Sequence, residues 1–193
     1  MATIYLIRHA EKPAGSVNGV DENGLQDPES LTPRGWQRAG ALAVYFHAAE
    51  GVERPDQIYA SPNLKEKIAP NEKEGSHSKR PAETVTPVAA RLGRSINLRF
   101  VKDGEADLAA ELVKQQGVSL VAWQHEAIPR IAGLVIGRTD ATPAVWPGER
   151  FDVIWRLTRA SPADSWSFAQ ICPELLAGDS GDPIPISAPS PVD

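Results

Sequence analysis

One stretch of the sequence, residues 118–123, reads VSLVAW and is apolar at almost every position. A strand that is apolar on both sides is typical of the centre of a parallel sheet, because helices cover both faces of such a sheet. Helical patterns separate most of the other strand-like runs, and this alternation predicts a three-layer α/β/α sandwich with a mostly parallel central sheet. The other predicted strands are residues 4–7, 55–61, 96–101, 151–157 and 166–171.

The predicted helices carry recognisable start and stop signals. Thr32 is a predicted N-cap, and Pro33 follows it at the first helical position, where a proline is tolerated. Gly93 is placed to end the second helix. Apolar residues at helical spacing indicate helices near residues 33–50, 81–92, 108–113 and 128–135.

Composition narrows the class of protein. A chain of 193 residues with 41% hydrophobic and 23% charged residues is typical of one soluble globular domain. A net charge of -5 argues against a nucleic-acid-binding surface. The single cysteine, Cys172, excludes an internal disulfide, and four scattered histidines give no metal-site spacing. No apolar run is long enough for a membrane span and no leader pattern is present, so we expect a cytoplasmic protein without membrane contacts.

Three segments lack the periodicity of helices or strands. Residues 12–31 form a long predicted loop that could make a functional rim over a site. Residues 63–79 are rich in lysine and glutamate, which predicts an insertion that is either a solvated loop or a cover that selects an anionic substrate. From Pro173 onward proline, serine and glycine predominate, so we predict one domain over residues 1–172 and a poorly ordered tail over residues 173–193.

Charged residues gather where predicted strands end. Arg8 and His9 follow the first strand, and His125 follows the strand at residues 118–123. In open α/β sheets ligands bind beyond the carboxyl ends of the strands, so we expect these side chains to meet there. Arg80 opens the second helix, whose N-terminus also favours an anion. Two guanidinium groups and two imidazoles around one volume predict a site for a phosphate group.

The sequence Arg8-His9-Ala10 resembles the Arg-His-Gly signature of the histidine phosphatase (phosphoglycerate mutase-like) superfamily, with alanine in place of glycine. Further segments resemble that family in kind and order, so the likeness covers about residues 3–157. The resemblance implies a phosphoglycerate mutase-like fold and a metal-independent phosphatase that needs no cofactor and acts on a small phosphorylated substrate. The other matching segments are Thr32-Pro33-Arg34-Gly35, Tyr59-Ala60-Ser61-Pro62, Arg80-Pro81-Ala82-Glu83-Thr84 and Trp123-Gln124-His125-Glu126.

The resemblance also implies roles for individual residues. His9 would be the nucleophile and form a transient phosphohistidine. Arg8, Arg80 and His125 would hold the phosphoryl oxygens. Apart from the resemblance, Glu11 is a candidate substrate-binding residue that could orient the site through a hydrogen bond, or it is a solvated loop glutamate. The residues agree with this division, because a neutral imidazole is a competent nucleophile at pH 7 and covalent catalysis splits the hydrolysis into two easier steps.

Two residues compete for the role of proton donor to the leaving group. Glu126 is favoured because it adjoins His125, and Glu105 is the alternative. Either carboxyl must be protonated to act, which requires burial or a neighbouring negative charge. Both are also compatible with solvated carboxylates at helix starts.

Two other functions are compatible with the same residues. The first is a binding module that keeps the anion pocket, lacks a working acid and binds a phosphorylated ligand. The second is a phosphoglycerate mutase, which is less favoured because no further arginine-rich segments are present to hold a bisphosphate. The sequence predicts no oligomeric state.

Overall fold

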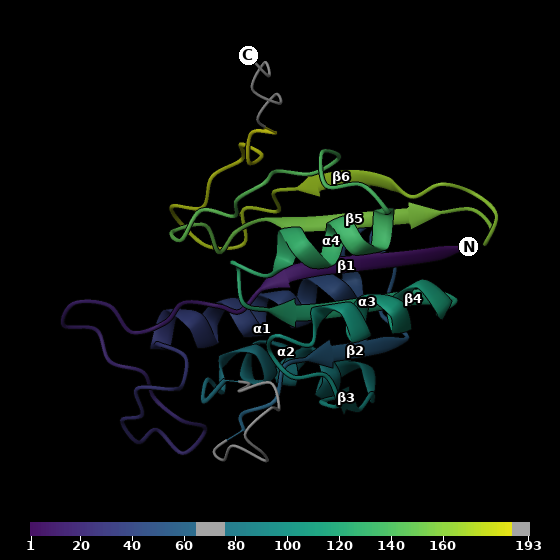
Figure 1. Ribbon diagram of the computed structural model, residues 1–193. Coiled ribbons are helices and arrows are strands. Elements are labelled where there is room, and N and C mark those ends of the chain that lie inside the picture. The colour runs from purple at the N-terminus through teal and green to yellow at the C-terminus, as the bar shows by residue number, and fades with distance from the viewer. Residues whose placement is uncertain (65–75, 187–193) are drawn as a thin grey trace.

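A computed structural model describes residues 1–64 and 76–186 of the protein. Its centre is a six-stranded sheet in the order β3-β2-β4-β1-β5-β6 (Figure 1). The strands are β1 (Ala2–Arg8), β2 (Gln57–Ala60), β3 (Ile96–Asn97), β4 (Gly117–Trp123), β5 (Ile154–Arg159) and β6 (Ser167–Ile171). The helices in the described part of the chain are α1 (Pro33–Ala48), α2 (Arg80–Leu92), α3 (Glu105–Lys114) and α4 (Ile128–Ile136).

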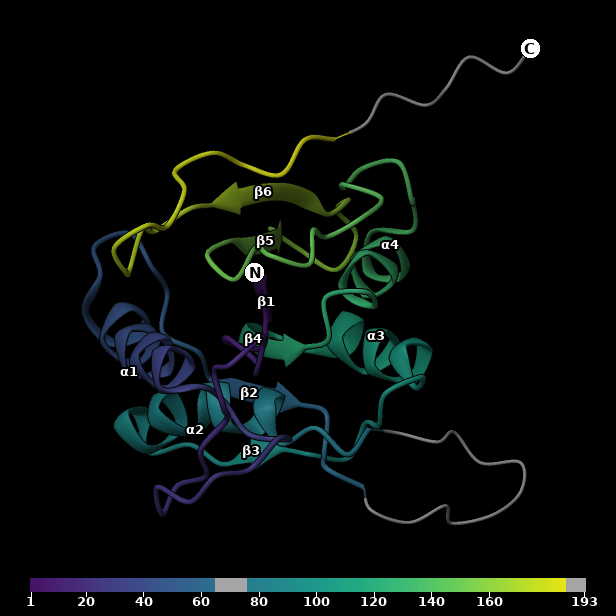
Figure 2. The ribbon, with the colours of Figure 1, turned by 90° about the vertical axis from the view of Figure 1, so that its left-hand side faces the viewer.

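The sheet is parallel on one side and antiparallel on the other. β1 and β2 pair parallel with β4, and β3 pairs parallel with β2. β5 runs antiparallel to β1, and β6 runs antiparallel to β5. Helices α1 and α2 cover one face of the sheet, whereas α3 and α4 cover the other (Figure 2). The predicted three-layer α/β/α sandwich with a mostly parallel sheet is therefore confirmed.

The central strand β4 contributes to the cores on both faces. Leu120 and Ala122 pack in the core that includes α1 and α2, and Val121 and Trp123 pack in the core that includes α3 and α4. All four side chains are fully buried. Because burying a large apolar side chain contributes about 1.5–3 kcal/mol, this strand is a strong determinant of the three-layer arrangement.

The predicted helix signals act as expected. The side chain of Thr32 accepts a hydrogen bond of 3.2 Å from the backbone N–H of Gly35, and Pro33 is the first residue of α1. Gly93 ends α2 in the left-handed conformation with φ of 63°. Local sequence thus determines where α1 starts and where α2 ends, and the N-terminal turns of both helices lie at the end of the sheet where β1 ends (Figure 1).

The third strand is shorter than predicted. β3 spans Ile96–Asn97, whereas the sequence predicted a strand over residues 96–101. It lies at the edge of the sheet and pairs only with Ile58 and Tyr59 of the short strand β2. Leu98, beyond this pairing, is 43% exposed. The predicted strand extends beyond the residues of β2 with which it could pair, and the backbone groups of a strand need a partner.

The segment after Pro173 also differs from the prediction. Composition predicted poor order, but residues 173–186 pack against the domain. Asp179 pairs with the buried Arg38 of α1, the backbone N–H of Ser180 donates to Asp152, and Ile184 is 3% exposed. These few long-range contacts hold a proline-rich segment that has no periodic pattern of its own. Residues 187–193 lie outside the described part of the chain.

The two described ends of the predicted insertion lie side by side. The backbone N–H of Leu64 donates to the carbonyl of Ser76 at 3.0 Å, and Asn63 forms a bridge with Ser76. The prediction for the rest of this segment concerns residues 65–75, which are outside the described residues. Within the described ranges, none of the helices has both the length and the apolar character needed to cross a membrane.

Candidate active site

His9 lies directly after β1, where its backbone N–H donates to the carbonyl of Trp123 at 3.0 Å. This bond continues the ladder between β1 and β4. His9 and the residues that follow Trp123 therefore lie together, beyond the C-terminal ends of these two strands. The His9 Nδ1 atom is 2.8 Å from the carbonyl oxygen of Ala10. A carbonyl can only accept a hydrogen bond, so Nδ1 carries the proton and Nε2 keeps its lone pair.

The protonation state of His9 follows from its surroundings. The residue is 4% exposed, and burial lowers its pKa to about 3 against an opposing effect of the Ala10 carbonyl. The positive charges of Arg8, Arg80 and His125 lower the pKa further. His9 is therefore a neutral imidazole at pH 7 with a free Nε2, as a nucleophile requires.

Arg8 ends β1 and is 2% exposed. Its Nη1 donates to the carbonyls of Gly148 and Arg150, and its guanidinium lies 3.8 Å from the centre of the Phe151 ring. Its Nε and Nη2 atoms are buried and have no hydrogen-bond partner among the described residues. A buried guanidinium with two unpaired N–H groups is suited to binding an anion. Unpaired buried donors are costly, and an anion would supply their acceptors.

Arg80 is the first residue of α2, at the helix end whose dipole favours an anion. Its Nη1 donates to the carbonyl of Pro28 at 3.0 Å, and its Nη2 lies 3.8 Å from Glu29. Burial lowers its pKa, although Glu29 and other acidic neighbours oppose this effect. Both contacts come from the loop at residues 12–31, which therefore reaches the candidate site as the sequence analysis anticipated.

His125 lies two residues after β4, with a side chain that is 24% exposed. Burial and the charge of Arg8 lower its pKa, against the opposing charge of Glu126. Its Nε2 faces Gly148, at which an added Cβ would lie 3.7 Å away. Because Arg8 also binds the Gly148 carbonyl, His125 and Arg8 flank the same turn.

The two carboxyl candidates for proton donor have different surroundings. Glu126 lies 3.0 Å from Nζ of Lys102 and 3.0 Å from Nδ1 of His125. Burial raises the pKa of Glu126, but its own backbone N–H, the bond from Lys102 and the nearby charges together bring it below the ordinary value. Glu105 is 1% exposed, and its Oε1 accepts hydrogen bonds from Nε1 of Trp123 and the backbone of Asp103. The surroundings of Glu126 therefore do not by themselves give a protonated acid at rest.

Glu11 is already engaged by other side chains. Arg38 of α1 donates to both carboxylate oxygens at 2.8–3.1 Å, and Nε of Arg34 lies 3.3 Å from Oε1. Its carboxylate therefore faces Arg38 and Arg34 in this structure, and the role of Glu11 in orienting the site stays a prediction.

Several neighbours of the site could not be named from the sequence. They are the backbone carbonyls of the 147–150 turn, the ring of Phe151, and Thr84, whose Oγ1 accepts the backbone N–H of Ala10 at 2.8 Å. The Pro-Gly pair at residues 147–148 signals a turn, but no local pattern indicates that this turn contacts Arg8. Ser61, in one of the segments that resemble the family, accepts a hydrogen bond of 2.8 Å from Nε2 of Gln124.

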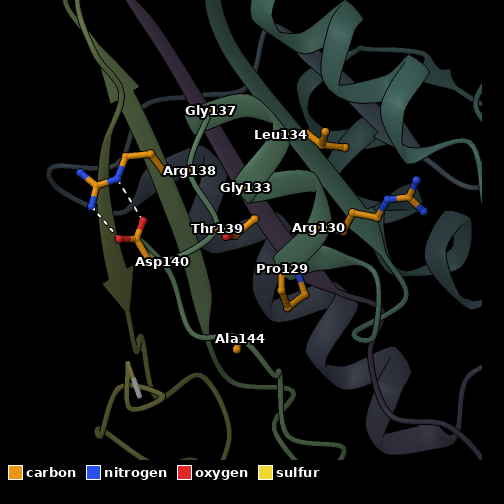
Figure 3. Close-up of a pocket in the computed structure, with 9 residues that line it drawn as sticks. All are labelled: Pro129, Arg130, Gly133, Leu134, Gly137, Arg138, Thr139, Asp140 and Ala144. Carbon is orange, nitrogen blue, oxygen red and sulfur yellow. Dashed lines mark hydrogen bonds and ion pairs between the residues drawn. The ribbon is translucent and has the colours of Figure 1, made fainter. Parts of the chain in front are cut away.

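A separate hollow of about 740 Å³ lies along the outer face of α4 (Figure 3). Its lining includes two arginines, but both are paired with carboxylates. Arg138 binds Asp140 through two hydrogen bonds of 3.0 Å, and Arg130 lies 3.5 Å from Glu105. The hollow contains no histidine and none of the predicted site residues. The sheet edge around His9 is therefore the better candidate for chemistry on an anion.

No protein-family model and no curated protein matches the sequence. Solved structures do match in fold. The protein histidine phosphatase SixA complexed with tungstate is 15% identical with a TM-score of 0.54, and the match covers 89% of this chain and 97% of that one. For a mycobacterial glucosyl-3-phosphoglycerate phosphatase the identity is 12%, the TM-score 0.52 and the coverage 87% and 96%.

A phosphoserine phosphatase from Entamoeba histolytica, solved as a mutant with phosphoserine, is 14% identical with a TM-score of 0.52, and the match covers 87% of this chain and 95% of that one. At such low identity these likenesses concern the fold. The chain thus has the same fold as these phosphatases, and the predicted phosphoglycerate mutase-like fold is confirmed.

Proposed function

We propose that the protein is a metal-independent phosphatase that hydrolyses small phosphomonoesters through a phosphohistidine at His9. The observation that carries this proposal is the fixed, neutral imidazole of His9, whose Nδ1 is bound to the Ala10 carbonyl so that Nε2 keeps its lone pair. The fold supports it, because the solved structures of this fold named above are phosphatases. The predicted cytoplasmic location belongs to the same proposal.

The proposed reaction has two steps. Nε2 of His9 attacks phosphorus, the ester P–O bond breaks, and the leaving oxygen takes a proton from an acid. Water then gives a proton to the acid that lost one in the first step, attacks phosphorus and breaks the P–N bond, which releases inorganic phosphate and restores both His9 and the acid. The unpaired Nε and Nη2 of Arg8, with Arg80 and His125, stabilise the charge on the phosphoryl oxygens in both steps.

Glu126 is the proposed acid, and its carboxylate lies 3.0 Å from Nδ1 of His125. Burial raises the pKa of Glu126, but its own backbone N–H and Lys102 bring it below the ordinary value, so the carboxyl is ionised before substrate binds. A bound phosphate brings negative charge close to this carboxyl and favours its protonated form, because like charges raise a carboxyl pKa. Glu105 stays the alternative acid.

Release of phosphate from an aryl phosphate by purified protein tests the proposal. The His9→Ala variant is expected to lose turnover, and the matched His47→Ala variant, altered in the last turn of α1, is expected to keep it. The wild-type protein should form an acid-labile, base-stable phosphoryl adduct, and a chelator should leave the rate unchanged. Full turnover by His9→Ala would refute the mechanism.

A binding module is the second candidate, and one observation favours it. The lowered pKa of Glu126 leaves that carboxyl without a proton at neutral pH. Vanadate binding together with no turnover of an activated aryl ester, which needs little protonation, would support this alternative. The predicted mutase activity is tested separately by interconversion of phosphoglycerates.

A further inference from the structure

A buried ion-pair cluster connects the residue two positions after His9 to the C-terminal segment. Arg38, on the inner side of α1, lies between the carboxylates of Glu11 and Asp179. Its Nε and Nη2 donate to Glu11 at 2.8–3.1 Å, and its Nη1 and Nη2 donate to Asp179 at 2.9 and 2.7 Å. The side chains of Arg38 and Asp179 are 4% and 3% exposed, and that of Glu11 is 14% exposed. All three nitrogens of the guanidinium are therefore used, in an almost dry environment.

We propose that Glu11, Arg38 and Asp179 act as positioning residues that hold the His9 ring in its reactive orientation. This inference rests on the proposed function of His9. The connection is short: the carbonyl that accepts the His9 Nδ1 proton belongs to the peptide unit that joins Ala10 to Glu11. Fixing the Glu11 side chain restricts rotation of that peptide, and so fixes the acceptor that determines which ring nitrogen is free.

The backbone of Glu11 is held from the same helix. Its carbonyl accepts the backbone N–H of Thr32 at 3.0 Å and the Thr32 hydroxyl at 3.3 Å. Gly35 lies so close that an added Cβ would be 2.7 Å from the Glu11 carbonyl oxygen. The start of α1 therefore binds the backbone of Glu11, and Arg38, one turn further along, binds its side chain.

The charges around Arg38 favour a positioning role for this cluster over a role in binding an anionic substrate. Burial alone would lower the pKa of Arg38, but the hydrogen bonds that Arg38 donates to Asp179 and Glu11 raise it instead. Two carboxylates already neutralise this guanidinium, so it is a poor partner for a further anion. Removing one member would leave an unpaired buried charge, which loosens the whole cluster rather than one contact.

Arg34 provides a matched control on the same helix. It lies 3.3 Å from Glu11 and 3.6 Å from Asp179, but its side chain is 46% exposed. Solvent screens such contacts, so the Arg34→Gln variant should keep the activity of the wild type. Arg159 provides a second control. It is a buried arginine that pairs across the sheet with Ala2, at the opposite end of β1 from His9.

The experiment compares Arg38→Met with Arg34→Gln and Arg159→Met, well below their melting temperatures. Arg38→Met should lower kcat on an aryl phosphate by roughly 10- to 100-fold with KM within about two-fold, because a small misplacement of a reacting group costs this much. Long-range ¹H–¹⁵N spectra should show His9 protonated at Nδ1 in the wild type and a mixture of tautomers in Arg38→Met. Arg159→Met should lose stability but keep kcat and the tautomer.

Glu11→Gln and Asp179→Asn keep the shape of the cluster. The same measurements of kcat and of the His9 tautomer are made on these variants if Arg38→Met does not fold. Unchanged kcat and an unchanged His9 tautomer in the folded variants would overturn the inference, as would an equal loss of kcat in Arg159→Met. If the wild type shows no phosphatase activity, the proposed function fails, but the tautomer of His9 still decides whether the cluster positions the ring.

Discussion

The backbone N–H of Ala10 donates a hydrogen bond of 2.8 Å to Oγ1 of Thr84, although the two residues are far apart in the sequence. Thr84 in turn donates to the carbonyl of Arg80 at 2.7 Å. One hydroxyl thus links the residue after His9 to the helical turn that begins with Arg80. The relative placement of the proposed nucleophile and the second guanidinium depends on this link.

Replacing Thr84 by valine should therefore destabilise the protein and impair the site. The Ala10 N–H would be buried without a partner, which costs about 1–3 kcal/mol, and kcat should fall as His9 loses its anchor. Thr86→Val is the matched control, because Thr86 is exposed and makes the equivalent bond to Ala82, so its effect should stay within about 0.5 kcal/mol. Urea unfolding of both variants measures the difference, and equal destabilisation would contradict the assignment.

Two glycines of α1 should respond to alanine in opposite directions. At Gly35 a Cβ would lie 2.7 Å from the Glu11 carbonyl oxygen, so Gly35→Ala should cost about 1–3 kcal/mol through steric strain and lower kcat. At Gly40, which is exposed, no atom lies within 4 Å of the added Cβ, so Gly40→Ala should stabilise the helix by about 0.5–1 kcal/mol. Thermal unfolding decides both signs, and a stable, fully active Gly35→Ala would show that the close approach is unimportant.

The buried His9 should make stability fall in acid. Its pKa is about 3 in the folded protein and about 6.5 in the unfolded chain, so below pH 6.5 the unfolded chain binds a proton that the folded protein does not. This contribution to the free energy of unfolding is fully present above pH 6.5 and is lost as the pH falls toward 3. The slope for one proton is about 1.4 kcal/mol per pH unit, and His9→Gln should lack it.

The same property is directly visible by NMR. The ring resonances of His9 should not titrate between pH 7.5 and 4.5, because the imidazole stays neutral over this range. A midpoint near 6.5 for His9 would mean that the ring is not held in the buried, neutral state.

Lys102 should tune the proposed acid. It bonds Glu126 at 3.0 Å and helps to lower the pKa of that carboxyl, so Lys102→Met should raise this pKa. If Glu126 donates the proton, the alkaline limb of the kcat profile should move to higher pH, and alkyl phosphates with poor leaving groups should gain most. Lys114→Met, altered at the end of α3, is the control. An unmoved alkaline limb in Lys102→Met would favour Glu105 or another donor.

Local patterns determined most of the fold and part of the candidate site. The apolar strand at residues 118–123, the Thr32 cap and Gly93 each act within a few residues, so the sequence alone predicts them. The same alternation predicts that β1 and β4 end at one edge, which brings His9 and His125 into the same region. The partial failure at β3 has a physical reason, since the length of a strand also depends on its partner.

Only the tertiary structure decided the partners of these residues. The pairing of Arg38 with Asp179 and the contact of Arg8 with the 147–150 turn join segments remote in the sequence, and neither leaves a periodic signal. For that reason a segment rich in proline and serine was expected to be poorly ordered, although one aspartate and one isoleucine bind it to the domain. The protonation state of a carboxyl could not be predicted from the sequence either, because burial and neighbouring charge arise only when distant parts of the chain pack together.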